Sequence, residues 1–274
     1  MRTIVHLSDL HFGRVDTEIL NPLIELVTRL APDVVVVSGD LTQRAHADQF
    51  QEARHFLDAL PMPQIVVPGN HDIPLYNLFK RFVDPLKNYR LYVTDELEPV
   101  YIDDEIAVVG INTARSLTIK DGRVNEEQIA LIHAHLAGLG EHVTKIVVTH
   151  HPFDLPDDFS DKDLVGRAKK AMETFAKCGA DLLLAGHLHV SHAESTAERY
   201  KFAGYSALVV QAGTATSTRV RGESNSFNVL RVGPSTIAVE RYHWEPGQRL
   251  FKHGKTETFA RASNVWTSVS RVMM

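Results

Sequence analysis

Five short polar segments each follow an apolar run of the length of a β-strand, and each contains Asp, Asn or His. They are Ser8-Asp9-Leu10-His11, Ser38-Gly39-Asp40, Gly69-Asn70-His71-Asp72, Thr149-His150-His151 and Ala185-Gly186-His187-Leu188-His189. A buried strand that stops abruptly leaves its next side chains at the rim of a sheet, where open α/β sheets place their ligands. Gly69, directly after Pro68, permits the tight turn that such a stop needs. The pattern predicts one polar site built from several strand ends.

The residue types in these segments are those that bind divalent metal ions. Carboxylate oxygens and imidazole nitrogens suit Zn, Mn, Fe and Co, and the lack of cysteine in the segments argues against a structural zinc cage. Seven ligands exceed the need of one ion, whereas two ions about 3.5 to 4 Å apart would use them and would clamp the two oxygens of an in-line displacement. Asp40, which follows Gly39 at a strand end, is the expected bridge. The candidate ligands are Asp9, His11, Asp40, Asn70, His150, His187 and His189.

The order of these motifs resembles the calcineurin-like metallophosphoesterase superfamily, which carries D-x-H, G-D, G-N-H-[DE], a histidine after a strand, and G-H-x-H. All five occur here without substitution between residues 9 and 189. Leu-Ser-Asp-Leu-His, Gly-Asn-His-Asp and Thr-His-His-Pro look most similar to the class III cyclic-nucleotide phosphodiesterase branch. The resemblance implies an α/β fold, a four-layer α/β/β/α sandwich with two mixed β-sheets flanked by helices.

The resemblance also implies a role for each residue. The first metal would be held by Asp9, His11 and His189, the second by Asn70, His150 and His187, and Asp40 would lie between them. His71 would assist the leaving oxygen or stabilise phosphoryl charge while a metal-bridging hydroxide attacks from the opposite side. His151 is an alternative to His150, but the first residue past the strand is favoured, which leaves His151 in a supporting role. The expected ions are Mn or Fe, with Zn or Co as alternatives.

Strands and helices alternate along the first two thirds of the chain. The expected strands are 3–7, 33–37, 65–67, 146–148 and 182–184, and helical periodicity falls between them, as in Ile19, Leu23, Val27 and Leu30 behind a cap at Asp16 or Thr17. The run Val34-Val35-Val36-Val37 has no alternation, which is typical of a strand covered on both faces. This rhythm predicts a largely parallel sheet with right-handed crossovers. A competing role for Asp40 is the N-cap of the helix expected within 42–60.

The remaining segments predict less regular structure. A short helix is expected over 75–82, a hairpin around 103–105, a helix behind the capping box Asn125-x-x-Gln128, and a mobile loop over 154–163. From residue 207 onward we expect strands without helices, forming an antiparallel half-sheet: 207–211, 227–232, 236–242 and 248–252.

The length and composition limit the classes of protein to which the chain can belong. The 274 residues suit a single metallophosphoesterase domain over 1–274, with 249–274 as a candidate C-terminal extension that could cover a partner subunit of a homo-oligomer. A net charge of −5 makes nucleic acid an unlikely partner. The lone Cys178 suits a reducing compartment, and the lack of a signal peptide or membrane span points to the cytoplasm.

These observations predict a metal-dependent hydrolase of a small-molecule phosphodiester, with 3′,5′-cyclic nucleotides as the leading substrate. The alternatives are other small phosphodiesters or phosphomonoesters, such as a glycerophosphodiester, a nucleotide-lipid pyrophosphate or a phosphonate ester. A nuclease ranks below these, and a non-catalytic scaffold is disfavoured because every ligand is retained. Loops would set the substrate. The candidate loops are 74–95, 115–123, 153–163 and 213–225, the last with Arg219 and Arg221.

Overall fold

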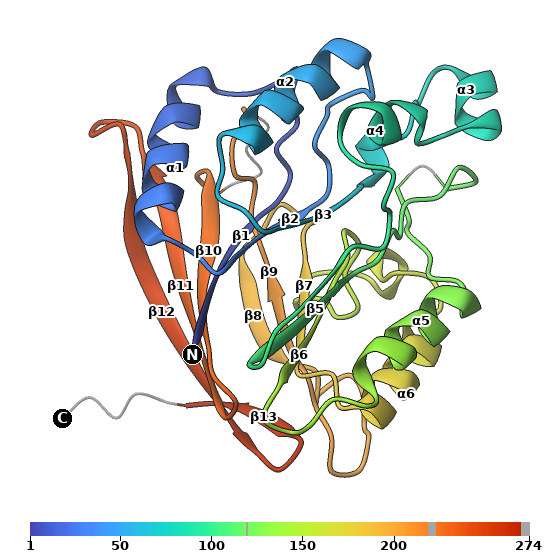
Figure 1. Cartoon of the computed structure of the whole chain (residues 1–274), viewed down its shortest axis with the longest axis vertical. Coiled ribbons are helices and arrows are strands. Elements are labelled where there is room, and N and C mark those ends of the chain that lie inside the picture. Colours follow the sequence, from blue (N-terminus) through green and yellow to red (C-terminus); the bar gives the residue numbers. More distant parts are fainter. Residues whose placement is uncertain (119, 219–222, 270–274) are drawn as a thin grey trace.

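Two mixed β-sheets stack face to face, and helices cover their outer faces (Figure 1). The computed structural model describes residues 1–118, 120–218 and 223–269. The predicted four-layer α/β/β/α sandwich is therefore confirmed. Among the residues described, no helix combines the length and the apolar character needed to cross a bilayer.

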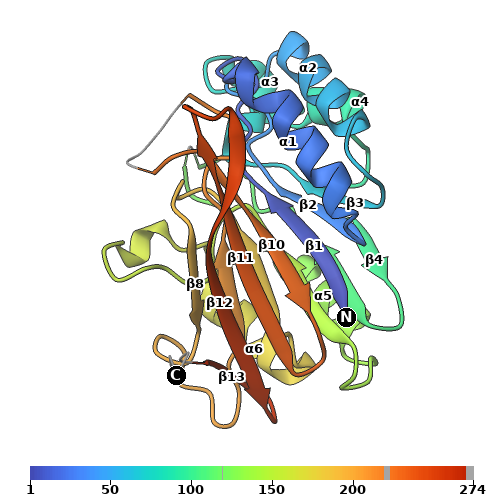
Figure 2. The ribbon, with the colours of Figure 1, turned by 90° about the vertical axis from the view of Figure 1, so that its left-hand side faces the viewer.

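The first sheet has seven strands, which lie side by side in Figure 2. Their order is β13 (Val265–Ser268), β12 (Leu250–Ala262), β11 (Thr236–Glu245), β10 (Ser226–Val232), β1 (Arg2–Leu7), β2 (Val34–Ser38) and β3 (Gln64–Val67). Strands β1, β2 and β3 are parallel, and the remaining pairings are antiparallel. The outer face of this sheet packs against α1 (Thr17–Leu30) and α2 (Ala47–Asp58).

The second sheet has six strands and a mainly parallel centre. Their order is β4 (Val100–Ile102), β5 (Ile106–Gly110), β6 (Thr144–Val148), β7 (Leu182–Ala185), β9 (Leu208–Gln211) and β8 (His192–Ser195). Only the edge strands β4 and β8 run antiparallel to their neighbours. Helices α5 (Glu126–Leu136) and α6 (Ala168–Cys178) cover the outer face.

The valine run of β2 shows why the layers form. Val34 and Val36 lie in the core between the sheets, whereas Val35 and Val37 lie in the core under α1 and α2. All four side chains are fully buried, as expected for a strand with apolar layers on both faces. Apolar side chains therefore hold the two sheets face to face. The carboxyl ends of the parallel strands lie at one edge of the stack, where a common site can form.

Three expectations about the elements need correction. β9 was expected in the antiparallel half-sheet, but it pairs in parallel with β7, because the segment between them makes the crossover through the edge strand β8 instead of a helix. The short helix predicted over 75–82 begins later, as α3 (Leu78–Val83), because the Asn77 side chain caps it by accepting from Lys80 N; within it Phe79 is 75% exposed. A second short helix, α4 (Lys87–Tyr92), follows it where a loop was expected.

Local signals elsewhere are confirmed. Asp16 caps α1, and Asn125 and Gln128 form the reciprocal capping box of α5. The hairpin predicted around 103–105 joins β4 to β5. The N-cap of α2 is His46, so Asp40 does not cap that helix.

Candidate metal centre

The loops after five parallel strands are bonded to one another at one edge of the stacked sheets. The Asp9 N–H donates to Gly39 O at 3.1 Å, and the His11 N–H donates to Asp40 O at 2.9 Å. In the other sheet, the Gly186 N–H donates to His150 O at 3.1 Å. These bonds hold the turns after β1, β2, β6 and β7 in fixed register, while the 3₁₀ turn η1 (Asn70–Asp72) follows β3.

Five of the seven candidate ligands adopt a left-handed backbone conformation, which non-glycine residues rarely do. Their φ values lie between 52° and 72°: Asp9, His11, Asp40, His187 and His189. Such a conformation costs about 1 kcal/mol or more per residue, and it persists only where the surroundings impose it. Its concentration at one place indicates a functional site.

The first ligand cluster contains Asp9, His11 and His189, all buried. Asp9 Oδ1 lies 3.6 Å from His11 Nε2 and 3.4 Å from His189 Nε2. Ligand atoms around a tetrahedral ion with bonds of about 2.1 Å would lie about 3.4 Å apart, so these separations suit one ion.

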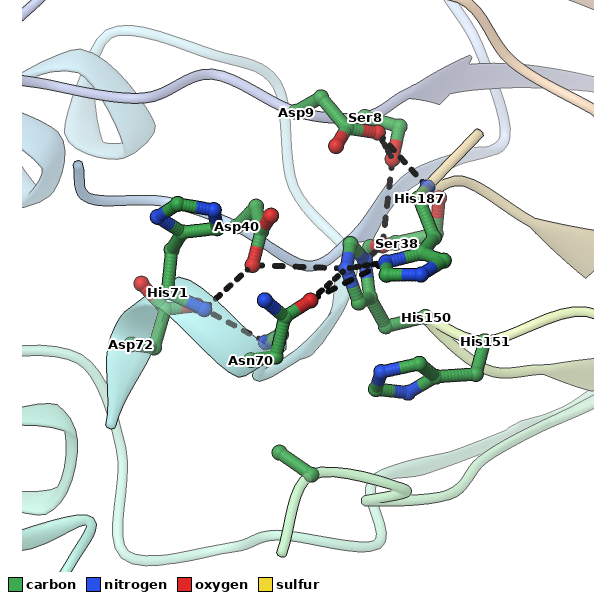
Figure 3. A network of polar contacts seen from close by, with 12 residues as sticks. Ser8, Asp9, Ser38, Asp40, Asn70, His71, Asp72, His150, His151 and His187 are labelled. Carbon is green, nitrogen blue, oxygen red and sulfur yellow. Dashed lines mark hydrogen bonds and ion pairs between the residues drawn. The ribbon is translucent and has the colours of Figure 1, made fainter. Parts of the chain in front are cut away.

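The second cluster is built around the Asn70 amide oxygen (Figure 3). Asn70 Oδ1 lies 3.1 Å from His150 Nε2 and 3.1 Å from His187 Nδ1, and the two ring nitrogens are 3.3 Å apart. Residues from β3, β6 and β7 therefore present their donor atoms to one point.

Asp40 lies between the two clusters. Its Oδ1 is 3.4 Å from His150 Nε2 of the second cluster, and its Oδ2 is 3.7 Å from His11 Nε2 of the first. The two oxygens of one carboxylate thus face the two groups of ligands. This is the arrangement expected of a bridging carboxylate.

Orphaned polar atoms indicate what these clusters are built to hold. Asp9 Oδ1 and both ring nitrogens of His11 are fully buried, yet none has a hydrogen-bond partner among the described residues. Unsatisfied buried polar atoms are costly and rare, and a bound cation would pair with Asp9 Oδ1 and with the unprotonated ring nitrogen of His11. The donor set and its separations fit divalent metal ions.

Electrostatics favour the ionised carboxylates. Burial opposes the charge of Asp40, but the neighbouring His150, His71 and His11 together outweigh burial and hold the pKa of Asp40 well below its ordinary value. At His150 burial is likewise opposed, because Asp40, Asp9 and the Ser38 carbonyl together raise the pKa of His150 to about 9. The Asp40 carboxylate is therefore ionised, which is the form that binds a metal ion.

His71 projects toward the first cluster without joining it. Its backbone N–H donates to Asp40 Oδ1 at 2.8 Å, and its Nδ1 lies 3.0 Å from Gln43 O. The ring meets that of His11 edge-on, with centroids 4.9 Å apart. Because the partner of Nδ1 is a carbonyl oxygen, Nδ1 carries the hydrogen and donates it. This hydrogen bond fixes the orientation of the ring, and Nε2 lies on the opposite edge.

Asp72, whose role was open from the sequence, positions two loops. Its buried carboxylate accepts hydrogen bonds from the backbone N–H groups of Leu41, Thr42 and Gly69, at 2.9 to 3.1 Å. Burial and the charge of Asp40 raise the pKa of Asp72 to about 6. The carboxylate ties the turn after β2 to the turn after β3, and so positions both Asp40 and His71.

His151 has the geometry of a supporting residue. One ring nitrogen, Nδ1, lies 2.8 Å from Thr113 Oγ1, and Nε2 lies 2.8 Å from Lys120 O. His150 Nε2 faces two candidate ligand atoms, Asn70 Oδ1 and Asp40 Oδ1, whereas His151 Nε2 faces the Lys120 carbonyl, so the geometry favours His150 over His151 as the ligand. His151 instead links the loop after β5 to the site.

Sequence reasoning missed several residues that support the ligands. The Ser8 hydroxyl donates to Asp9 Oδ2 at 2.7 Å, His189 Nδ1 lies 2.6 Å from Thr214 Oγ1, and His150 Nδ1 lies 2.8 Å from Ser38 O. Ser8 sits next to a motif and could have been inferred. Thr214 lies 25 residues from its partner with no periodic signal.

The candidate specificity loops differ in what they offer. Arg115 points inward, where it donates to Gln128 Oε1 at 2.6 Å, and this makes it a structural residue. Two residues of the loop 154–163, Asp154 and Asp161, each form an ion pair of 2.5 Å with the guanidinium of Arg199. Arg219 and Arg221 lie outside the described residues.

The chain belongs to the calcineurin-like phosphoesterase family, whose model matches residues 2–191. It is 28% identical to the glycerophosphodiester phosphodiesterase GpdQ of Enterobacter lignolyticus over 56% of this chain and 58% of that protein. It is 23% identical to the 3′,5′-cyclic adenosine monophosphate phosphodiesterase CpdA of Escherichia coli K12 over 57% of this chain and 54% of that protein. The chain thus spans just over half the length of these curated relatives.

A solved structure shares the fold over nearly the whole chain. A dimetal phosphatase from Danio rerio superposes with a TM-score of 0.66, covering 95% of this chain and 99% of that chain at 14% identity. At this identity the likeness concerns the fold alone. The family match over residues 2–191 confirms the predicted superfamily.

Proposed function

We propose that this chain hydrolyses phosphodiesters at a centre of two metal ions, with His71 acting beside the phosphorus. The observation that supports this most strongly is the position of Asp40, whose two oxygens face two separate clusters of ligands. The proposed ligands of the two ions, with Asp40 shared, are Asp9, His11, Asp40, Asn70, His150, His187 and His189.

The ions would supply Lewis-acid activation of water and of the phosphoryl oxygens, with Mn or Fe expected and Zn or Co as alternatives. The protein's own part is to aim His71. With Nδ1 held against Gln43 O, the protonated ring would present its Nε2–H to the leaving oxygen or to a phosphoryl oxygen. Asp72 keeps this geometry by fixing the turn on which His71 lies.

The names of the relatives support two substrate classes, 3′,5′-cyclic nucleotides and glycerophosphodiesters. We take cyclic nucleotides as the leading physiological candidate and broad activity on other small phosphodiesters or phosphomonoesters as the alternative. A nuclease is disfavoured by the net charge of −5. We further propose a cytoplasmic location, and homo-oligomerisation stays a prediction.

The test compares the wild-type protein, reconstituted with Mn, with His71→Ala on bis(p-nitrophenyl) phosphate. We expect kcat to fall by about 10²- to 10⁴-fold in the variant at unchanged metal content, because His71 transfers a proton without binding metal. If both proteins load metal and are equally inactive, the chain is a binding module. A panel with cyclic AMP and a glycerophosphodiester then ranks the two substrate classes.

A further inference from the structure

A small pocket of about 170 Å³ opens directly beside His71 and Asn70. Arg44 and Lys120 line it together with the apolar side chains of Ile73 and Leu75. Since His71, the proposed partner of the leaving oxygen, itself lines this pocket, the leaving group would occupy it.

Contacts position the Arg44 side chain and the Lys120 backbone at this pocket. The Arg44 guanidinium lies over the Tyr76 ring, 5.1 Å from its centroid. Lys120 is fixed through its backbone, since its carbonyl lies 2.8 Å from His151 Nε2, and His151 in turn contacts Thr113. His151 thus both supports the metal site and positions the Lys120 backbone.

Neither cation is neutralised by the protein. In the portion of the chain that the structure describes, no carboxylate lies within 4.0 Å of the Arg44 guanidinium or the Lys120 ammonium. The chain as a whole carries an excess of acidic residues, with 34 Asp and Glu against 29 Lys and Arg. Two unpaired cations in one pocket beside the reacting centre therefore indicate a site for an anion.

We propose that Arg44 and Lys120 form a leaving-group subsite that selects phosphodiesters whose leaving group carries a second negative charge, such as a phosphate or a carboxylate. This inference rests on the proposed function and favours its alternative, other small phosphodiesters, over its leading candidate, cyclic nucleotides. A cyclic nucleotide offers no such second charge, whereas a diester linked through pyrophosphate does. Apolar contacts from Leu75 would accompany the charge recognition.

The test uses two esters that differ only in this charge, methyl 4-nitrophenyl phosphate and methyl 3-carboxy-4-nitrophenyl phosphate. For the Mn-reconstituted wild-type protein we expect kcat/KM to be about tenfold higher for the carboxylated ester. In Arg44→Gln/Lys120→Gln this ratio should fall to about one or below. The matched control is Lys80→Gln/Lys87→Gln, which removes two positive charges from the adjacent pocket that does not contain His71 and should keep the wild-type ratio.

A binding measurement separates this inference from the proposed function. Benzylmethylphosphinate and its 4-carboxybenzyl analogue have P–C bonds in place of the scissile ester, so titration calorimetry reports affinity without turnover. We expect the carboxylated compound to bind wild type about tenfold more tightly and to lose this advantage in Arg44→Gln/Lys120→Gln. Equal affinities in wild type, or an equal advantage in both proteins, would overturn the subsite even if the hydrolase stands. Absence of turnover on both esters alongside selective binding would overturn the hydrolase and leave the subsite.

Discussion

At the scale of single residues, the site depends on backbone positions that are unfavourable on their own. Asp9, His11 and Asp40 have positive φ, and hydrogen bonds between neighbouring turns hold them there. Such strain at a functional site is offset by the packed sheets beneath it. Motif spacing predicted which residues meet, because parallel strands end at a common edge. It could not predict the role of Thr214, which depends on how a distant loop folds back.

The carboxylate of Asp40 should be needed by both clusters. In Asp40→Ala we expect metal content to fall from two ions per chain to less than one, since the oxygens that face His11 and His150 are both lost. Elemental analysis after reconstitution measures this, with His71→Ala as the variant that should retain both ions. Full occupancy in Asp40→Ala would refute the shared ligand.

Gly69 should resist substitution because Asp40 lies against it. A Cβ at Gly69 would come within 2.2 Å of Asp40 Oδ1 and 2.3 Å of Asp40 N, so the two turns must move apart. We expect Gly69→Ala to lower the free energy of unfolding by about 1 to 3 kcal/mol and to reduce metal content. Urea unfolding and elemental analysis measure the two effects.

Gly138→Ala is the control, because nothing lies within 4 Å of the Cβ that it adds. Its stability should stay within about 1 kcal/mol of wild type. Similar losses of stability in Gly69→Ala and Gly138→Ala would show that the contact with Asp40 does not cause the destabilisation.

At the scale of elements, sequence patterns were informative where burial decides the structure. The uninterrupted valines predicted β2, and the capping box predicted the start of α5. The edge strand β8, with the polar sequence His192–Ser195, gives no apolar signal because it is only partly buried. β12 (Leu250–Ala262) extends far beyond the predicted 248–252. Most of its residues are exposed, so the sequence lacks the alternation of apolar and polar residues that predicts a strand.

The hairpin between β4 and β5 should depend on pH through Asp103. Its carboxylate accepts from the N–H groups of Glu105 and Ile106 at 2.8 and 2.9 Å and pairs with Arg2. Burial opposes the charge, but these hydrogen bonds outweigh burial and lower the pKa of Asp103. The charged form therefore stabilises the folded state above the unfolded pKa of about 4, and this contribution is lost as pH falls through the lower folded pKa.

We expect Asp103→Asn to reduce the free energy of unfolding by about 1 kcal/mol at pH 7. The difference from wild type should shrink as the solution is acidified below about pH 4, where wild type loses the charge as well. Urea unfolding of both proteins, in chelator so that metal binding does not contribute, measures the difference at each pH. A constant difference across this range would contradict the assigned charge effect.

At the scale of the whole molecule, the proposed ions would join the two sheets. Asp9, His11 and Asp40 follow strands of the first sheet, whereas His150, His187 and His189 follow strands of the second. Ions bound by both sets would crosslink the halves of the sandwich. The layers could be predicted from the sequence, because the apolar strands need cover on both faces. The parallel pairing of β9 with β7 depends on tertiary packing that no local pattern encodes.

Metal removal should therefore lower the stability of the whole fold. An ion bound only by the native state at a thousand times its Kd stabilises it by about 4 kcal/mol, so we expect chelator to lower the Tm by about 5 to 10 °C. Differential scanning fluorimetry measures this, and added Mn should restore the original value. Asp40→Ala should respond much less, and an unchanged Tm in chelated wild type would argue against tight binding.

The most direct measurement is an anomalous-difference map from crystals of the Mn-reconstituted protein. We expect two peaks about 3.5 to 4 Å apart, one beside Asp9, His11 and His189 and one beside Asn70, His150 and His187, with the Asp40 carboxylate between them. A single peak, or two peaks that share no carboxylate, would contradict this expectation.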